Sequence, residues 1–323
     1  MNLRLVTDEA EAVLQILTKR SQNRPITDAD WSRVFSSEGY VRLKQRETAM
    51  KRSFEDAEFK TFVLSSQLSE RAKVLQETLE RWKRADILRT ADRALAYLPK
   101  NARINAKIYP VIKPRENSFV FGVPDDPAIF LYLNPATSRE KFENTLAHEL
   151  HHIGFGSSCT PKQLSDDIAK LPAETQTVLK WIGAFGEGFA MLAAAGGPDI
   201  HPHAVSDAEE RGRWNRDMAN FSGDLKKVEK FFLDVLAKRL NETEIRDTAF
   251  SFFGIQGPWY TVGYKMAVLI EKTYGRDVLI NAMCDQRLLL EKYNQAAFES
   301  NRRSHDQLPL WSATLLSAPQ QPH

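Results

Sequence analysis

The spacing of apolar positions predicts helices from residue 8 to about residue 97. Thr27 precedes acids at 28 and 30 and apolar side chains at 31, 34 and 35, the pattern of a capped helix start. Gly39 is expected to interrupt that helix. Residues 67–97 form a long amphipathic stretch without glycine or proline, which Pro99 is expected to end.

The pattern changes beyond residue 100. Short runs of β-branched and aromatic residues at 108–113, 118–121 and 129–133 predict a small sheet. Helical spacing then returns, around 172–195, 205–241, 258–273 and 276–297. We therefore expect a predominantly α-helical α+β fold. Its organisation is expected to be an N-terminal helical region, 1–100, and a catalytic domain, 101–323, or one continuous unit.

A further helix is predicted to begin at about residue 138, from the capping-box pattern of residues 137–140. Phe142, Leu146, Leu150 and Ile153 recur at helical spacing. The glycines at 154 and 156 are expected to end it.

This helix carries the most informative motif of the chain, HELHH at residues 148–152. His148 and His152 are four residues apart, so both imidazoles lie on one helix face and can bind one Zn²⁺ ion. Glu149 lies about 100° further round the helix, where its carboxylate can serve as general base toward a water activated by the metal. His151 is expected to take no part.

A catalytic zinc ion usually has three protein ligands, so one more is needed. The metzincin pattern fails, because glycine stands at 154, one place too early, and Ser158 occupies the third histidine position. Glu187 is the best candidate, since it is a lone acid amid Ala, Phe, Gly and Leu, and neighbouring glycines would let two helices approach closely. Asp199, His201 and His203 are the alternatives.

Stabilisation of a developing oxyanion needs a hydrogen-bond donor. Tyr260 and Tyr264 are four residues apart on one predicted helix and offer two hydroxyl groups. Aromatic core packing explains either of them equally well. Tyr260, near the helix start, is the preferred donor.

Composition excludes other classes of protein. The chain has 44 basic and 42 acidic residues, a net charge of +2 without a basic block, so no nucleic-acid partner is expected. No run approaches the roughly 20 apolar residues of a membrane span. The two cysteines, Cys159 and Cys284, could pair or stay free. The chain as it stands is expected to be cytoplasmic, or exported if a signal peptide was removed.

Together these residues resemble the gluzincin metallopeptidases, the thermolysin-like group with HExxH and a downstream Glu. The resemblance implies a zincin-like core, one zinc ion held by His148, His152 and Glu187, and a peptide or protein substrate. The segment Asn117–Val120 is similar to the edge strand on which such enzymes hold the substrate backbone. The family's Asp, four residues beyond the Glu ligand, is Met191 here, so the outer-shell partner must differ.

The order of features along the whole chain is still more similar to an uncharacterised family of zinc-dependent peptidases. Those features are Asp30-Trp31, residues 95–99, Ile112-Lys113-Pro114, Asn117-Ser118-Phe119, HELHH, Glu187-Gly188 and residues 260–264. The hypothesis is therefore a zinc metallopeptidase. A catalytically silent zinc protein with a binding or regulatory role, and a metal-free helical scaffold, are the competing hypotheses.

Overall fold

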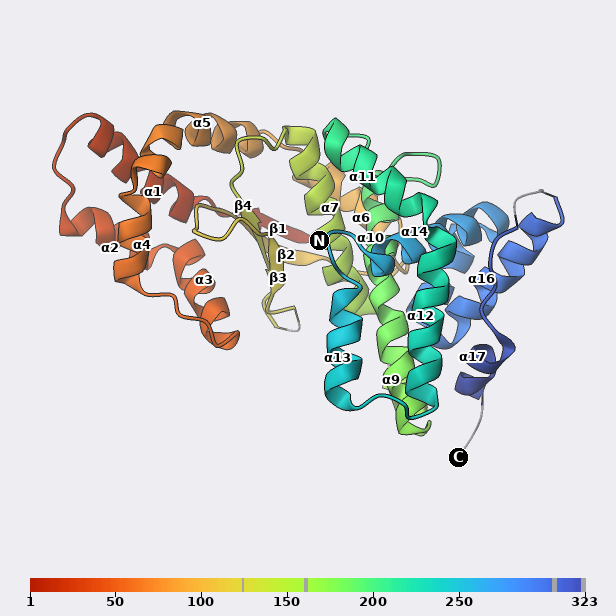
Figure 1. The fold of residues 1–323 in the computed structure, drawn as a ribbon. Helices are drawn as coiled ribbons and strands as arrows, with labels where there is room; N and C mark the ends of the chain where they lie inside the picture. The colour runs from red at the N-terminus through yellow and green to blue at the C-terminus, as the bar shows by residue number, and fades with distance from the viewer. Residues whose placement is uncertain (124, 160–161, 304–306, 321–323) are drawn as a thin grey trace. The chain divides into compact units, whose positions relative to one another are not determined.

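The computed structural model describes residues 1–123, 125–159, 162–303 and 307–320. The fold is α+β and mostly helical, with one four-stranded sheet in these ranges (Figure 1). The chain divides into two compact units, residues 1–91 with 103–153, and residues 92–102 with 154–323. The predicted organisation into 1–100 and 101–323 stays a prediction.

The sheet belongs to the first unit. It is formed by β1 (Asn2–Leu5), β2 (Asn105–Val111), β3 (Phe119–Phe121) and β4 (Ala128–Tyr132), in the order β1-β2-β4-β3. β2 is parallel to β1 and to β4, while β3 pairs antiparallel with β4 and lies at the edge. The three predicted strands are confirmed, and β1 is an addition.

The first unit also contains helices. They are α1 (Asp8–Ser21), α2 (Asp28–Ser36), α3 (Glu38–Ala49), α4 (Asp56–Val63), α5 (Ser66–Lys83), the start of α6 (Ile87–Leu95) and most of α7 (Arg139–Ser158). α1 packs against β2 and against α2, α3, α4 and α5. Its inward face is apolar, with Val13, Leu14 and Leu17 almost wholly buried, which explains why it lies at the centre of this unit.

Two predicted helix boundaries were wrong. The break before α3 falls at Ser37, whose hydroxyl accepts from the backbone N–H of Tyr40, and Gly39 lies inside the helix. Gly39 serves packing, because a Cβ there would lie 2.9 Å from Cβ of Glu9. The stretch 67–97 is two helices, α5 and α6, with a break at 84–86 that no glycine or proline marks.

Glu9 is a buried carboxyl group in the first turn of α1. It is 1% exposed, and its Oε2 accepts from the backbone N–H of Ile112 at 3.0 Å. Its Oε1 has no hydrogen-bond partner among the described residues. Burial raises the pKa of Glu9 from 4.5 to about 8.

This raised pKa predicts a pH-dependent stability. The folded protein binds more protons than the unfolded chain between about pH 4.5 and about pH 8, so the free energy of unfolding should fall as the pH rises through that window. Glu9→Gln is expected to flatten the decline, measured by urea unfolding at several pH values. Glu77→Gln, an exposed change on α5, should keep the wild-type slope. An unchanged slope in Glu9→Gln would refute the assignment.

The second unit is helical throughout its described part. Its helices, after the end of α6 and of α7, are α8 (Lys162–Ile168), α9 (Ala173–Ile182), the 3₁₀ turn η1 (Gly183–Phe185), α10 (Gly186–Ala195), α11 (Ala208–Ala219), α12 (Phe221–Leu236), α13 (Glu242–Ser251), α14 (Pro258–Tyr274), α15 (Arg276–Cys284), α16 (Gln286–Asn301), α17 (Ala313–Ser317) and the 3₁₀ turn η2 (Ala318–Gln320). α14 contacts α10, α12, α15 and α16, and α9 lies beside α12 (Figure 1). The predicted helical stretches are confirmed, but three of them are divided, at η1, at Asn220 and at Asp285.

One stretch of this unit bears on the expectation that the chain has no membrane span. Residues 173–195, which form α9, η1 and α10, are long and apolar enough to cross a membrane by length and composition. Their most apolar window is 67% buried inside the protein. Such burial is typical of a core helix, so this stretch is weak evidence for a membrane span.

The two cysteines form a disulfide bond between Cys159, after α7, and Cys284, at the end of α15. The sequence left their pairing open. The compartment itself stays a prediction.

Candidate metal centre

α7 presents the HELHH motif on a firmly anchored helix. Ser138 caps it, with its hydroxyl accepting from the backbone N–H of Lys141 at 3.1 Å. The predicted apolar stripe is buried, and the Phe142 ring stacks on Trp82 at 4.5 Å between centroids. The helix does not end at Gly154 or Gly156 but continues to Ser158, because packing of residues such as Ile153 outweighs the low helix propensity of glycine.

His148 and His152 meet on one face of α7. Their Nε2 atoms are 3.0 Å apart, and their rings are nearly perpendicular at 4.6 Å between centroids. Two nitrogen ligands at 2.0–2.1 Å in tetrahedral geometry would be roughly 3.3 Å apart. The pair therefore fits one zinc ion with a shift of a few tenths of an ångström, and both side chains are half-buried.

The other two polar residues of the motif differ in burial. Glu149 is half-buried, like the two histidines, so its carboxylate keeps access to solvent. His151 is wholly buried and projects from another part of the helix surface. This arrangement suits a base beside a metal site and a histidine that packs in the interior.

Glu187 lies in the second unit, in the first turn of α10. Every other residue of this helix is buried, and Glu187 is its one half-exposed residue and its one charged residue. A carboxylate in a first turn also faces the positive end of the helix dipole. The position of Glu187 is therefore fixed, because a rotation of α10 about its axis would expose the buried apolar side chains of this helix.

The predicted close approach of helices beside Glu187 is confirmed. A Cβ on Gly188 would lie 2.0 Å from the backbone nitrogen of Tyr264 and 2.4 Å from the backbone oxygen of Tyr260. A Cβ on Gly263 would lie 2.4 Å from the backbone oxygen of Phe185. Each helix thus presents a glycine where the other passes, and the start of α10 is fixed against α14.

The two tyrosines of α14 have different surroundings. Tyr264 is 8% exposed, packs edge-on against Trp214 at 5.3 Å, and donates its hydroxyl to the backbone oxygen of Ile200 at 3.3 Å. Burial, with a smaller contribution from Asp199, raises the pKa of Tyr264 to about 12. Tyr260 is half-buried. The Tyr264 hydroxyl is thus engaged in the protein interior, and Tyr260 is the more accessible of the two.

The alternative ligands have structural partners of their own. Asp199 pairs with Lys272 at 2.6 Å and is 82% exposed. His201 Nε2 lies 2.9 Å from Asn215 Oδ1, and its Nδ1 accepts from the backbone N–H of His203. His203 is buried, and its Nδ1 lies 2.9 Å from Ser206 Oγ. Asp199 and His201 thus have partners within the protein, whereas the Nε2 of His203 has no hydrogen-bond partner among the described residues.

The edge segment before β3 is organised by a residue to which the sequence assigned no role. Lys113 is 3% exposed and donates through Nζ to Asn117 Oδ1 at 2.6 Å. Ser118 Oγ accepts from the backbone N–H of Tyr132. The segment is thus fixed by its own side chains as it enters the edge strand. The Ile112-Lys113-Pro114 motif was the only signal of this role.

Comparison with known proteins supports the same class. A family model described as "Putative zinc dependent peptidase (DUF5700)" matches residues 5–302. Because the match covers nearly the whole chain, the protein belongs to this family. No curated protein and no solved structure matches the chain. The family description implies zinc dependence and a peptide or protein substrate.

Proposed function

We propose that this protein is a zinc metallopeptidase of the gluzincin type, with a zincin-like core. The observation that carries the proposal is the His148–His152 pair, whose Nε2 atoms are 3.0 Å apart. Glu149 directly follows His148 in the sequence. The chain that carries this motif belongs to a family of zinc-dependent peptidases. Zinc bound there would polarise the scissile carbonyl and lower the pKa of a bound water molecule.

The chain's own residues have distinct parts in this mechanism. His148 and His152 bind the metal ion as neutral imidazoles. Glu149 accepts a proton from the attacking water and delivers it to the leaving amine. Its half-buried carboxylate is accessible enough for both transfers.

Glu187 is the third ligand in this proposal. Its support is the chemistry of the donor set, in which two imidazoles and one carboxylate leave a fourth position for water. The half-exposed carboxylate on an otherwise buried helix provides a fixed oxygen ligand.

Glu187→Gln is expected to weaken zinc binding by at least about 100-fold, since loss of an outer-shell partner alone costs 10–100-fold. Zinc content by elemental analysis and hydrolysis of a mixed peptide library would be measured together, with and without a chelator. Glu174→Gln, at an acid that pairs with Lys238 at 3.0 Å, is the matched control. Full zinc content in Glu187→Gln would show that another residue is the ligand.

Tyr260 is the proposed donor to the oxyanion. The hydroxyl of Tyr264 is engaged with Ile200 in a buried setting, whereas Tyr260 is more accessible, near the start of α14.

Tyr260→Phe is expected to lower turnover by about 10²–10³-fold, because the transition state would lose a hydrogen bond. Tyr264→Phe should instead lower the free energy of unfolding by about 1 kcal/mol, through the lost bond to Ile200, and leave turnover unchanged. Steady-state kinetics and urea unfolding distinguish the two tyrosines. The reverse pattern would assign the oxyanion to Tyr264.

The substrate backbone is proposed to lie along β3. This strand is at the sheet edge, antiparallel to β4, so its outer side offers backbone groups to an extended peptide.

A further inference from the structure

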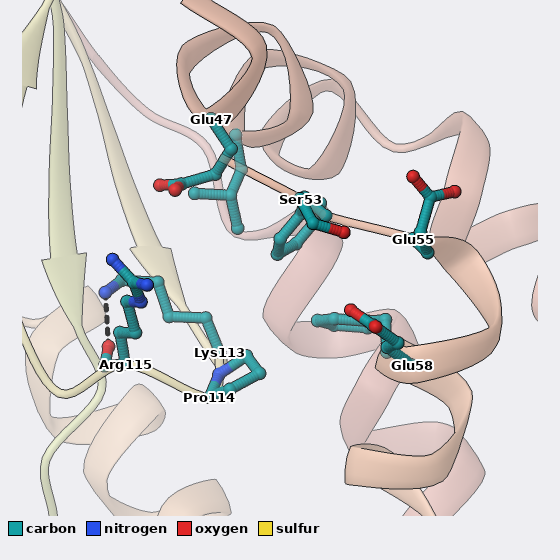
Figure 2. A pocket seen from close by; sticks show the side chains of 10 residues that line it. Glu47, Ser53, Glu55, Glu58, Lys113, Pro114 and Arg115 are labelled. Carbon is teal, nitrogen blue, oxygen red and sulfur yellow. Dashed lines mark hydrogen bonds between the residues drawn. The ribbon is translucent and has the colours of Figure 1, made fainter. Parts of the chain in front are cut away.

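A cavity of about 230 Å³ lies in the first unit, apart from the HELHH motif. It is enclosed by α3, by α4 and the segment before it, and by the segment after β2 (Figure 2). Its walls are formed by Leu43, Glu47, Ser53, Phe54, Glu55, Glu58, Phe59, Lys113, Pro114 and Arg115. The proposed peptidase mechanism uses none of these residues.

The charges of the cavity are separated. Figure 2 shows Lys113 and Arg115 on one side, and Glu55 and Glu58 on the other. The Lys113 ammonium is anchored on the Arg115 backbone oxygen and Asn117. The Arg115 guanidinium is exposed and forms no ion pair with a described residue. Its side of the cavity is therefore suited to an anion.

The acidic side has carboxylates available for a cation. Glu55 and Glu58 are exposed, and no described residue forms an ion pair with either. Glu47 differs, because it is 6% exposed and pairs with Arg46 at 2.6 Å and Arg52 at 3.9 Å. Its charge is compensated inside the protein, so the unpaired acids are the two on α4 and just before it.

The surface between the two sides is apolar. Leu43 and Phe59 are buried, and Phe54 is half-buried beside them, with its ring 5.8 Å from that of Phe59. Such a surface favours a hydrocarbon stem, and aromatic rings also attract a nearby ammonium group. The volume is below the roughly 300–1,000 Å³ of sites for drug-sized ligands, so a molecule the size of one amino acid fits.

We propose that this cavity binds a lysine residue with a free α-carboxylate, either as free lysine or as the C-terminus of a peptide. Arg115 holds the carboxylate through its paired N–H donors. Glu55 and Glu58 hold the side-chain ammonium, and the four-carbon stem lies on Phe54, Phe59 and Leu43. The proposal does not rest on the peptidase activity.

Isothermal titration calorimetry on the full chain tests this proposal. All titrations use chelator-treated protein, so that ligand carboxylates do not bind at a metal centre and peptides are not cleaved. The ligands are lysine, Gly-Gly-Lys, norleucine, which lacks the side-chain amine, and cadaverine, which lacks the carboxylate. We expect norleucine and cadaverine to bind at least about tenfold more weakly than the better of the two lysine ligands. Whichever of lysine and Gly-Gly-Lys binds more tightly shows whether the ligand is free lysine or the C-terminus of a peptide.

Two variants test which residue binds the carboxylate of the ligand and which binds its side-chain ammonium group. Arg115→Gln should weaken the binding of lysine about tenfold or more and leave the binding of cadaverine unchanged. Glu58→Gln should weaken the binding of lysine and leave the binding of norleucine unchanged. Arg89→Gln and Glu77→Gln, at exposed positions of the same unit outside the cavity, are the matched controls and should bind as wild type. The proposal would be overturned if neither lysine nor Gly-Gly-Lys bound, if cadaverine bound as tightly as the better of these two ligands, or if the variants were indistinguishable from their controls.

Discussion

Replacing Glu149 with glutamine is expected to lower hydrolysis of a mixed peptide library by about 10²–10⁴-fold, the usual contribution of a general base. The amide has nearly the shape of the carboxylate but cannot accept the proton from water. Zinc content should stay at the wild-type value, because His148 and His152 still provide the imidazole pair. Turnover and elemental analysis would be measured on the same preparation.

Glu140→Gln is the matched control for this change. Glu140 is on the same helix and is about half exposed, in the first turn, where it pairs with Arg139 at 3.3 Å. Its loss should cost at most about 1 kcal/mol of stability and no activity. Wild-type hydrolysis by Glu149→Gln with zinc retained would contradict the mechanism. A wild-type protein that binds zinc but cleaves no peptide would favour the catalytically silent hypothesis.

Replacing Gly188 with alanine is expected to lower the free energy of unfolding by about 3 kcal/mol, the upper end of overpacking effects. The new Cβ would meet backbone atoms of α14 at 2.0 Å and 2.4 Å. Backbone atoms cannot move aside by a rotamer change, so the two helices must separate. Urea unfolding measures the loss, and peptide hydrolysis should fall with it, because Glu187 is the preceding residue.

Gly186→Ala provides the control in the same turn. A Cβ there would have no heavy atom within 4 Å, and alanine has the higher helix propensity, so stability should stay the same or rise by up to about 1 kcal/mol. If both alanine variants were equally stable, the close contact between α10 and α14 would be wrong.

The predicted chemistry of α7 needed only local information. An i, i+4 pair of histidines shares a face in any α-helix, and the apolar stripe ensures that this segment is helical. The observed distance of 3.0 Å between the two Nε2 atoms agrees with this. The strands after residue 100 were predictable for a similar reason, because short runs of β-branched and aromatic residues favour β-strands over other secondary structure.

Helix ends were harder to predict because they depend on packing. Gly154 and Gly156 are ordinary termination signals, yet α7 passes through both. Gly39 is an ordinary interruption signal, yet it lies within α3 beside Glu9. A glycine costs only about 1 kcal/mol in a helix, and burial of neighbouring apolar side chains exceeds that cost. Only the surroundings reveal whether a glycine ends a helix or allows a close approach.

The sequence by itself determined the α+β, mostly helical class of fold. It also determined that His148 and His152 share one helix face, because that placement depends on residues within one or two helical turns. Tertiary structure decided what depends on distant segments. β1 exists because Asn2–Leu5 pairs with β2, about a hundred residues away. Cys159 meets Cys284 across a separation of 125 residues. The surroundings of Tyr264 follow from Ile200 and Trp214, which lie 64 and 50 residues before it in the chain and contact its side chain. Such pairings depend on how the whole chain buries its apolar surface, and local spacing does not contain that information.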